Sequence, residues 1–414
     1  MVIRKITGLV LLIALLPALA AAQPNISEKA LRKHITFLAD DRLEGRGTGS
    51  EGERIAAEYI AKHFRQLGLK PMGDNGSYFH NFGFKKNTDP HGANAESAPQ
   101  VYSRNVAAFL DNGAPLTIVI GAHYDHIGLG YDRNSREPNP EGKIHNGADD
   151  NASGTAGVLE LARYLSKNKA REKHNFLFLC FSAEELGLIG SKKFTDYPTI
   201  DLSTVNFMIN MDMIGRLKPE KILFVGGVGT APDFVPTINS LQSPLVIRQD
   251  SSGIGASDHT SFYLKNIPSL FFFTGQHDDY HKPSDDADKI NYKGEKMVLE
   301  YIAALIESLD NQPRQKFQET QSKQEETPRF KVTLGIMPDY TSEDTGLRVD
   351  GVNEGRPGHK AGLLKGDIII GLGEYEIKDV MGYMKALARF QKGDATDIKI
   401  QRNGTIINLP VVFE

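Results

Sequence analysis

The chain has a single cysteine, Cys180, among its 414 residues. A lone cysteine cannot close an internal disulfide, so packing and hydrogen bonds have to hold the fold, even in an oxidising compartment. Cys180 lies within an apolar stretch that reads Asn-Phe-Leu-Phe-Leu-Cys-Phe-Ser. On such a stretch we expect a small buried side chain and not a catalytic thiol.

An excess of charge of one sign is also absent. The chain has 48 Lys and Arg against 52 Asp and Glu, which gives a net charge of -4, and it has no long basic run. This balance gives no electrostatic basis for binding nucleic acid, so no such partner is expected. A composition of 40% hydrophobic and 24% charged residues is ordinary for a globular chain that buries a full core.

Long hydrophobic runs are missing apart from the first residues. Arg4 and Lys5 precede the apolar run Leu9–Leu16, and the small residues Ala20–Ala22 follow it. The run is too short to span a bilayer and is typical of a secretory signal. We therefore predict a signal peptide over residues 1–22, export to a periplasm or out of the cell, and no integral membrane segment after its removal. A retained membrane anchor is the alternative.

The next part of the chain alternates short apolar runs with amphipathic helical patterns. The helical patterns cover Ser27–Asp40, Glu51–Leu67, Gly157–Leu165 and Glu295–Leu309. Near-continuous apolar strands between helices indicate an α/β domain, with a mainly parallel mixed sheet flanked by helices, over residues 23–310. The predicted strands are Val106–Leu110, Leu116–Ile120, Phe176–Phe181, Phe207–Met211, Leu270–Phe273 and, more weakly, Ile222–Val225.

A change of composition divides the chain near its C-terminal end. Residues 311–328 are rich in Gln, Glu, Lys and Arg, with Phe317 as the only large apolar residue. Such a segment cannot bury enough surface to order itself, so we predict a flexible linker. Residues 329–414 then form a separate, small β-rich domain.

Histidine and carboxylate side chains follow several of the predicted strands. If these strands are parallel neighbours, the side chains meet at one edge of the sheet. Taken singly, each is an ordinary loop residue. Together they would repel one another unless cations neutralise them, and they suffice for two zinc ions. The residues are His123, Asp125, Asp149, Asp150, Glu184, Glu185, Asp212, His277 and His281.

Six short blocks containing these residues make the pattern specific. In this order they resemble the co-catalytic dizinc aminopeptidases of metallopeptidase family twenty-eight. The resemblance covers roughly Leu31–Leu309 and implies a phosphorylase/hydrolase-like α/β fold. The blocks are His123-Tyr-Asp125-His, Asn146–Gly154, Ala183–Gly187, Asn210–Gly215, Ser257-Asp-His259 and Tyr280–Asp286.

The resemblance also implies roles for single residues. Asp149 would bridge two zinc ions, with His123 and Asp212 completing one site and Glu185 and His281 completing the other. These five residues are the expected metal ligands.

Other residues are expected around the ligands. Glu184 would be the general base that activates a water held between the ions. Asp125 would hold His123 in one tautomer. Asp150, joined to Asp149 by a cis peptide bond, and Asp258 would lie beside the ligands or contact substrate. No ligand role is implied for His126, His145, His259 or His277.

Two loops are candidate walls of the active site. Gly128–His145 is rich in Gly, Asn and Pro, and either shapes substrate access or is a tolerated insertion. The segment from Asp250 to Ser257 is a second, flexible candidate.

The C-terminal segment resembles a PDZ domain of the bacterial, protease-associated kind. The resemblance rests on Val332–Ile336, Gly346–Val352, Pro357–Leu372 and a hairpin at Arg402-Asn403-Gly404. It implies a groove for a peptide C-terminus, with backbone amides of Leu334, Gly335 and Ile336 receiving the carboxylate. A spacer domain with an unused groove is the alternative.

The expected function is therefore an exported dizinc aminopeptidase that hydrolyses the N-terminal residue of a peptide. Three different functions remain possible. One is a zinc carboxypeptidase of related fold, and the second is an enzyme like the glutaminyl cyclases, which hold one metal. The third is an inactive peptidase fold that acts through its PDZ domain.

Overall fold

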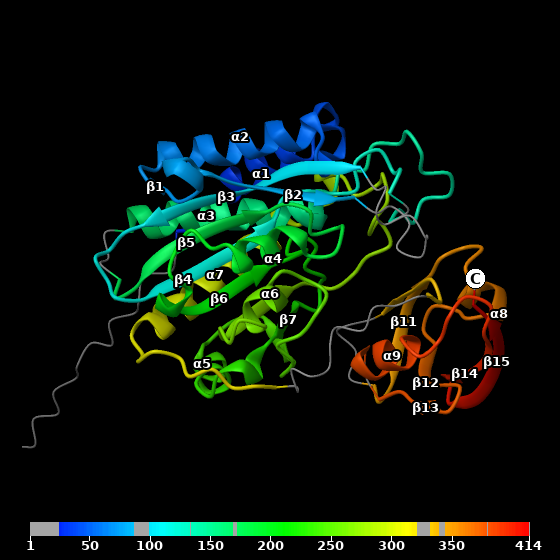
Figure 1. The fold of residues 1–414 in the computed structure, drawn as a ribbon. Coiled ribbons are helices and arrows are strands. Elements are labelled where there is room, and N and C mark those ends of the chain that lie inside the picture. The colour runs from blue at the N-terminus through cyan, green and yellow to red at the C-terminus, as the bar shows by residue number, and fades with distance from the viewer. Residues whose placement is uncertain are drawn as a thin grey trace, which may run out of the picture.

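A computed structural model describes residues 25–86, 99–132, 134–168, 172–320, 332–338, 344–378 and 380–413. The predicted signal peptide lies outside these residues. Residues 25–320 form an N-terminal unit and residues 332–413 a C-terminal unit (Figure 1). Among the described residues, no helix is long and apolar enough to cross a membrane.

One mixed sheet runs through the N-terminal unit. Its strand order is β1-β3-β5-β4-β6-β9-β7-β8, with β2 paired to β3. The central strands β5, β4, β6 and β9 are parallel, whereas β3 and β7 join them in antiparallel pairs. The sheet is therefore parallel in its centre, with antiparallel pairs on either side, and its last pair, β7 with β8, is again parallel. The strands are β1 (Lys70–Pro71), β2 (Phe79–Lys85), β3 (Gln100–Leu110), β4 (Thr117–His123), β5 (Asn175–Phe181), β6 (Val205–Met211), β7 (Ile222–Gly226), β8 (Val246–Gln249) and β9 (Ser269–Phe273).

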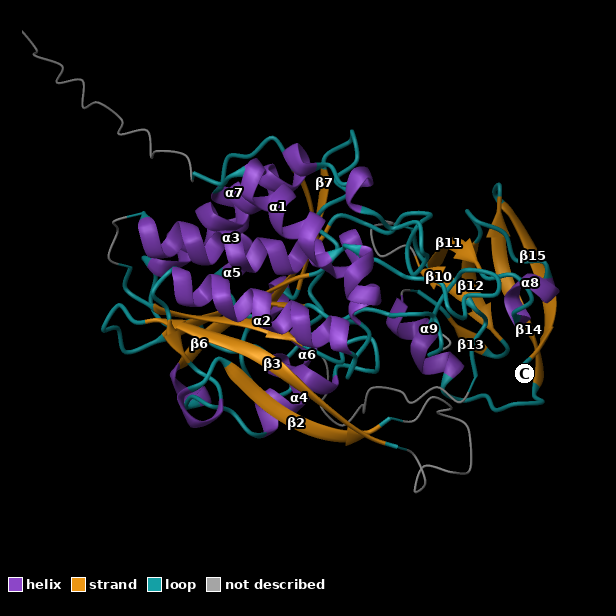
Figure 2. Ribbon diagram, turned by 90° about the horizontal axis from the view of Figure 1, so that it is seen from above, coloured by secondary structure: helices purple, strands orange, loops and turns teal. Residues whose placement is uncertain are grey.

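Helices cover both faces of this sheet (Figure 2). Every residue of β4, β5 and β6 is buried, because side chains that alternate along a strand enter two separate cores. Ile118 belongs to a core that includes residues of α1, α2, α3, α5 and α7, whereas its neighbour Val119 belongs to a core that includes residues of α4 and α6. The helices are α1 (Glu28–Leu38), α2 (Glu51–Gln66), α3 (Gly154–Lys167), α4 (Ile189–Asp196), α5 (Phe234–Ser240), α6 (His259–Tyr263) and α7 (Tyr292–Asp310).

The first part of the predicted linker differs from the expectation. Residues 311–320 lie against the N-terminal unit, where the backbone amide of Gln315 donates to Asn206 Oδ1 at 2.7 Å and that of Gln318 donates to Thr230 O at 2.8 Å. The ring of Phe317 packs 5.4 Å from that of Tyr263. Composition misled here because backbone hydrogen bonds and one aromatic contact order a segment that has little apolar surface of its own.

The C-terminal unit has a sheet and a core of its own. Its strand order is β10-β11-β12-β14-β15, with β13 paired to β12, and its core includes Leu334, Val349, Ile369 and Ile398. Asn403 and Gly404 both have positive φ at the tight turn between β14 and β15, as the hairpin prediction requires. The elements are β10 (Ile336–Pro338), β11 (Leu347–Val352), α8 (Pro357–Ala361), β12 (Ile368–Leu372), β13 (Tyr375–Glu376), α9 (Val380–Leu387), β14 (Ala395–Arg402) and β15 (Thr405–Val412).

Phe178 lies in the centre of β5 and is fully buried against the helices of the larger core. Phe178→Ala is expected to lower the free energy of unfolding of the N-terminal unit by about 3–5 kcal/mol, because it removes buried apolar surface and leaves a cavity. Urea denaturation followed by circular dichroism measures this. Tyr102→Ala is the matched control, since Tyr102 on β3 is 75% exposed. Equal losses in the two variants would contradict the assigned core.

Candidate metal centre

The carboxyl ends of the central strands bring the predicted polar residues together. His123 is the last residue of β4, Asp212 directly follows β6, and Glu184 and Glu185 lie just past β5. His281 comes from the segment after β9. The turn Ala148–Ser153, before α3, lies between them and supplies Asp150.

Two groups of donor atoms form on opposite sides of Asp150. On one side, His123 Nε2 lies 3.3 Å from Asp150 Oδ1 and 3.4 Å from Asp212 Oδ1. On the other, His281 Nε2 lies 3.2 Å from Asp150 Oδ2 and 3.1 Å from Glu185 Oε2. Ligands about 2.0–2.1 Å from a tetrahedral zinc ion lie about 3.3 Å from each other, so both groups fit such an ion.

The position between the two groups belongs to Asp150, not to Asp149 as predicted. Asp149 turns away, because its Oδ1 accepts a hydrogen bond from Gly215 N at 2.6 Å and its Oδ2 lies 3.2 Å from His277 Nε2. The cis peptide bond joins Asp150 to Asn151, again one residue later than predicted. Two adjacent aspartates cannot be told apart by residue type. The backbone turn decides which one faces the histidines.

Residues of the same turn and of the segment after β9 fix Asp150 in place. Asp285 is fully buried, and its Oδ2 accepts hydrogen bonds from the amides of Asp149 at 2.9 Å and Asp150 at 3.1 Å. Asn151 Oδ1 accepts from the amides of Gly154 and Met213, and its amide group donates to Met211 O. Asp285 lies within one of the six blocks, but its residue type alone predicted no role for it.

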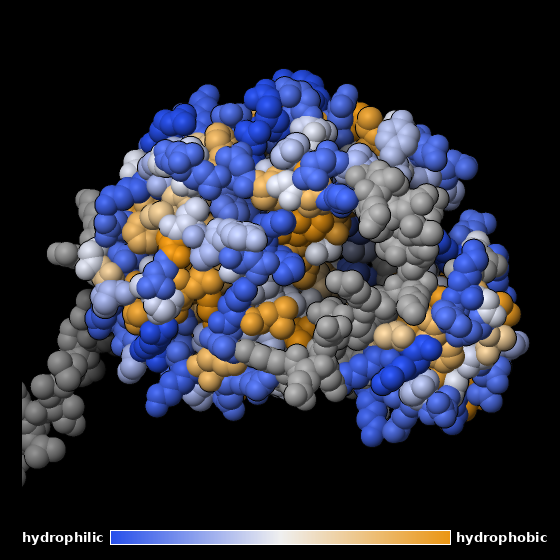
Figure 3. All heavy atoms as spheres, in the orientation of Figure 1, coloured by the Kyte–Doolittle hydropathy of each residue, from blue (hydrophilic) through white to orange (hydrophobic). Residues whose placement is uncertain are grey.

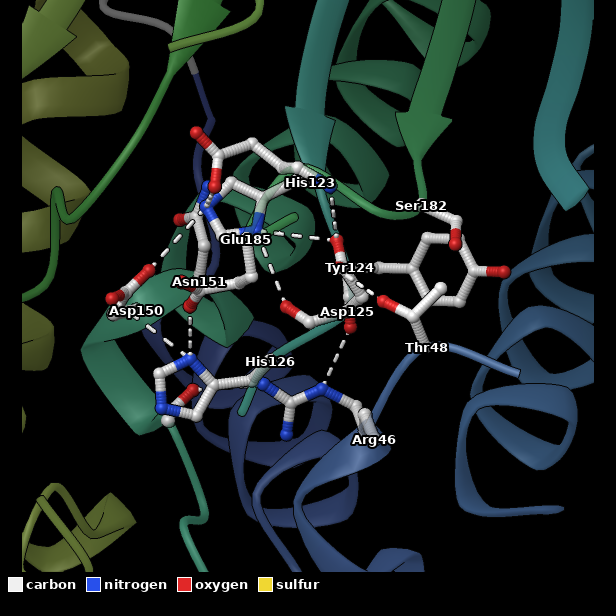
Figure 4. A network of polar contacts seen from close by, with 12 residues as sticks. Arg46, Thr48, His123, Tyr124, Asp125, His126, Asp150, Asn151, Ser182 and Glu185 are labelled. Carbon is white, nitrogen blue, oxygen red and sulfur yellow. Dashed lines mark hydrogen bonds and ion pairs between the residues drawn. The ribbon is translucent and has the colours of Figure 1, made fainter. Parts of the chain in front are cut away.

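The ring of His123 is oriented by Asp125. His123 Nδ1 lies 3.2 Å from the backbone oxygen of Asp125 and 3.6 Å from its carboxylate (Figure 4). A proton on Nδ1 leaves Nε2 free to bind a metal. The Asp125 carboxylate itself accepts from the Thr48 hydroxyl at 2.9 Å and from the Glu184 amide at 3.2 Å. Asp125 therefore links the histidine to the segment that carries Glu184.

Glu184 lies beside the first donor group, with its Oε2 3.8 Å from His123 Nε2. Burial raises the pKa of Glu184 well above its ordinary value; the neighbouring carboxylates of Asp212 and Glu185 also raise it, whereas His123 opposes them. A carboxyl group whose pKa is raised is better suited to hold and pass on a proton than an ordinary exposed one.

Asp258, predicted to lie beside the ligands or to contact substrate, is buried and does not line the cavity described below. Burial raises its pKa to about 7. Its neighbour Ser257 has the more direct role, because the Ser257 hydroxyl donates to Asp212 Oδ2 at 2.8 Å and so orients that carboxylate.

One histidine for which no ligand role was expected, His126, also reaches the site. His126 Nδ1 lies 2.7 Å from Glu185 Oε1 and 3.9 Å from Asp150 Oδ2, so His126, Asp150 and Glu185 form a compact donor group. His277 contacts Asp149 instead. The remaining pair, His145 and His259, make local contacts, with Ser135 and with the ring of Phe271. Only position after a strand distinguishes His126 in the sequence, and that signal is weak.

Arg46 was not predicted at all, and it is completely buried under the site (Figure 4). It donates to the carbonyls of Tyr124 at 2.8 Å, Asn146 at 2.7 Å and Gly147 at 3.0 Å, and to that of Leu38. Burial lowers its pKa to about 10, opposed by nearby acids that include Asp125 and Asp150. Arg46 thus stays charged at neutral pH and joins the segment after β4 to the turn that carries Asp150.

A cavity of about 430 Å³ opens from the donor groups. Its apolar part is made by Met213, Phe224, Ile254, Phe271 and Phe273. Figure 3 shows apolar side chains gathered beside a recess on this face of the molecule.

The two predicted wall loops behave differently. The segment from Asp250 to Ser257 supplies several lining residues, as expected of a wall. The loop Gly128–His145 supplies no described lining residue. It instead positions the second donor group, because His281 Nδ1 lies 2.8 Å from Asn134 O and Asn134 Nδ2 donates to Glu185 O at 2.7 Å.

Arg46→Met is expected to lower the free energy of unfolding by about 3–5 kcal/mol, because it strips four buried carbonyls of their donor and leaves buried carboxylates without a compensating charge. Urea denaturation of the metal-free protein measures this. Arg42→Met is the control, since Arg42 pairs with Asp40 on the surface and should matter little. A stable, metal-binding Arg46→Met protein would show that Arg46 does not support the site.

Comparisons with known proteins place both units. Residues 105–306 match the sequence profile of peptidase family M28, and residues 331–412 match that of the PDZ domain.

Three curated relatives cover part of the chain. The uncharacterized protein YfbL of Escherichia coli is 28% identical over 50% of this chain and 70% of its own length. Aminopeptidase YwaD of Bacillus subtilis is 29% identical over 46% of this chain and 41% of its own length. Leucine aminopeptidase 1 of Grosmannia clavigera is 27% identical over 63% of this chain and 62% of its own length. The chain thus spans between 41% and 70% of the length of these relatives.

Solved structures agree with the fold. The LapA aminopeptidase of Legionella pneumophila has a TM-score of 0.53 at 19% identity, covering 70% of this chain and 72% of its own. A zinc aminopeptidase of Bacillus subtilis has a TM-score of 0.54 at 17% identity, covering 73% and 100%. A glutaminyl cyclase of Porphyromonas gingivalis has a TM-score of 0.55 at 17% identity, covering 69% and 99%. At these identities the similarity establishes the fold alone. By their sequence profiles, residues 105–306 of the first unit carry a peptidase family M28 domain, and residues 331–412 carry a PDZ domain.

Proposed function

We propose that this chain is a dizinc aminopeptidase that removes an apolar N-terminal residue from peptides. One observation carries the proposal. The two carboxylate oxygens of Asp150 face two separate groups of donor atoms, His123 with Asp212 and His281 with Glu185. Such an arrangement suits two neighbouring cations that share one carboxylate.

The residues of the site divide the chemistry among them. When bound, two zinc ions lower the pKa of a water and polarise the carbonyl of the scissile bond. Glu184 lines the cavity, takes the proton from the attacking water and returns it to the departing amine. Asp125 fixes the orientation of the His123 ring and the position of the Glu184 backbone through hydrogen bonds. Ser257 fixes the orientation of the Asp212 carboxylate in the same way.

The charge of the cavity favours an amino terminus as the end that is held. The lining residues described in the peptidase domain include five acidic side chains and neither Lys nor Arg. Three of these carboxylates, Asp150, Glu185 and Asp212, would be neutralised by the two ions. Glu184 and Asp250 are not needed as ligands, and a free α-amino group would be stabilised beside them. This argues against a carboxypeptidase. The acidic residues are Asp150, Glu184, Glu185, Asp212 and Asp250.

A glutaminyl cyclase and an inactive peptidase fold have less support. A cyclase with one metal would not need both donor groups, and an inactive fold would be expected to have lost a donor. The apolar part of the cavity, including Phe224 and Phe271, suits an apolar side chain on the first residue. The names of curated relatives as aminopeptidases agree with this choice.

Export and peptide binding by the PDZ domain complete the proposal. Residues 1–22 have the charge and apolar pattern of a secretory signal, which would place the enzyme in a periplasm or outside the cell.

The strand β10 is an edge strand, paired only with β11 among the described strands, and Gly335 beside it has a φ of 70°. Leu334, Gly335 and Ile336 would there receive a peptide carboxylate.

Metal analysis tests the shared position. Asp150→Ala is expected to reduce bound zinc from about two ions per chain to less than one, because both donor groups lose an oxygen. Asp149→Asn, next to it in the chain, is expected to retain most of the metal. Mass spectrometry of the purified proteins after dialysis counts the ions. If Asp149→Asn lost the zinc and Asp150→Ala kept it, Asp149 would be the residue shared by the two metal positions.

Peptides with free and with blocked amino termini test the reaction. Wild-type protein is expected to release the first residue only from the free peptides, and Glu184→Gln is expected to lower kcat on the order of thousands-fold, the upper range for general acid–base catalysis. Its zinc content should stay that of the wild type. Unchanged activity of Glu184→Gln, or cleavage of the blocked peptides, would overturn the proposal.

A further inference from the structure

We propose that the PDZ domain forms the outer wall of the catalytic cavity and restricts the enzyme to short peptides with a free C-terminus. This inference rests on the proposed aminopeptidase function. The cavity that opens from Glu184 and Glu185 is also lined by Asp344, Gly346, Lys378 and Met384 of the PDZ domain. The two domains thus share one binding space.

The helix α9 supplies part of this wall. Tyr383, Ala386 and Leu387 belong to the buried core of the PDZ domain, and Met384, half-buried, packs against that core and also lines the catalytic cavity. In Figure 2, α9 lies on the side of the PDZ domain that faces the peptidase domain. The helix therefore stands between the PDZ core and the cavity.

Specific contacts hold the wall close to the donor groups. Arg136 Nε donates to Asn353 Oδ1 of the PDZ domain at 2.9 Å, and the backbone amide of the same Arg136 donates to His281 O at 3.0 Å. One residue thus joins the second donor group to the PDZ domain. Lys365 adds a more exposed link, 3.2 Å from both Asp278 of the peptidase domain and Asp350 of its own domain.

This geometry limits the length of a substrate. An amino terminus bound among the carboxylates leaves the rest of the peptide to run outward, with each residue adding up to about 3.3–3.6 Å. Those residues meet the PDZ wall. A short peptide ends inside the cavity, but a long one has to displace the wall and break the contacts of Arg136 and Lys365.

Charge at the wall suits the end of a short peptide. Among the described lining residues, Lys378 is the only Lys or Arg, and it belongs to the PDZ domain. Its present partner is Glu376 at 3.3 Å, a pair that is largely exposed and easily exchanged. Asp344 of the PDZ domain also lines the cavity but is paired with Arg348, so Lys378 is the cation that this wall offers to the carboxylate of a short peptide whose amino terminus lies near Glu184.

A series of peptides that begin with leucine and lengthen from a dipeptide to a decapeptide tests this inference. For the wild-type enzyme, kcat/KM is expected to fall with length. In the double variant Asn353→Ala with Lys365→Ala, kcat/KM for the decapeptide is expected to rise by about tenfold, equivalent to about 1.4 kcal/mol, with the dipeptide unchanged. Asn408→Ala with Lys392→Ala makes the same changes elsewhere on the PDZ surface and should keep the wild-type profile.

A second variant is independent of how the domains are held. Lys378→Gln is expected to raise KM for a tripeptide with a free carboxylate and to leave its C-terminal amide unaffected. The inference fails if the double variant cleaves the dipeptide but keeps the wild-type dependence of kcat/KM on length. It also fails if Lys378→Gln changes KM equally for the tripeptide and for its C-terminal amide. Failure of the wild-type enzyme to cleave any peptide would overturn the peptidase function itself, and this inference with it.

Discussion

The mutual repulsion of buried carboxylates is the constraint on which the rest of this structure depends. Asp150, Glu184, Glu185 and Asp212 lie within one small space, and three imidazoles contact them, those of His123, His126 and His281. Buried charges of one sign are costly unless cations or strong hydrogen bonds compensate them. Asp150 keeps the number of carboxylates low, because it presents one oxygen to each donor group and a single side chain thus serves two positions.

Buried strands and the positive charge of Arg46 stabilise this cluster of carboxylates. The parallel strands β4, β5 and β6 end at one edge and are buried along their whole length, which holds His123 and Asp212 with little freedom. Arg46 supplies a permanent positive charge beneath the cluster and joins segments far apart in the chain. Asp285 secures the backbone of the turn at Asp150.

The PDZ domain forms part of the boundary of the catalytic cavity. An open peptidase edge would accept chains of any length, whereas here a second domain closes part of the cavity through Met384 and Lys378. Arg136, in the loop Gly128–His145, contacts both Asn353 of the PDZ domain and the backbone of His281. The positions of the PDZ wall and of the His281 side chain therefore depend on the same loop. Substrate choice and metal-site geometry are then linked by short-range contacts.

The sequence by itself determined the fold class, the presence of polar residues just after the central strands, the C-terminal domain, and the types of side chain that meet at the sheet edge. Continuous apolar runs and the short blocks at their ends depend on local pattern, which a single chain displays. Tertiary structure decided which of Asp149 and Asp150 faces the histidines, and it brought in His126, Arg46 and Asp285. Those outcomes depend on backbone direction at one turn and on contacts between distant segments, and residue type and spacing do not encode either. The ordered segment 311–320 and the shared wall of the cavity likewise arise only when separate parts of the chain pack together.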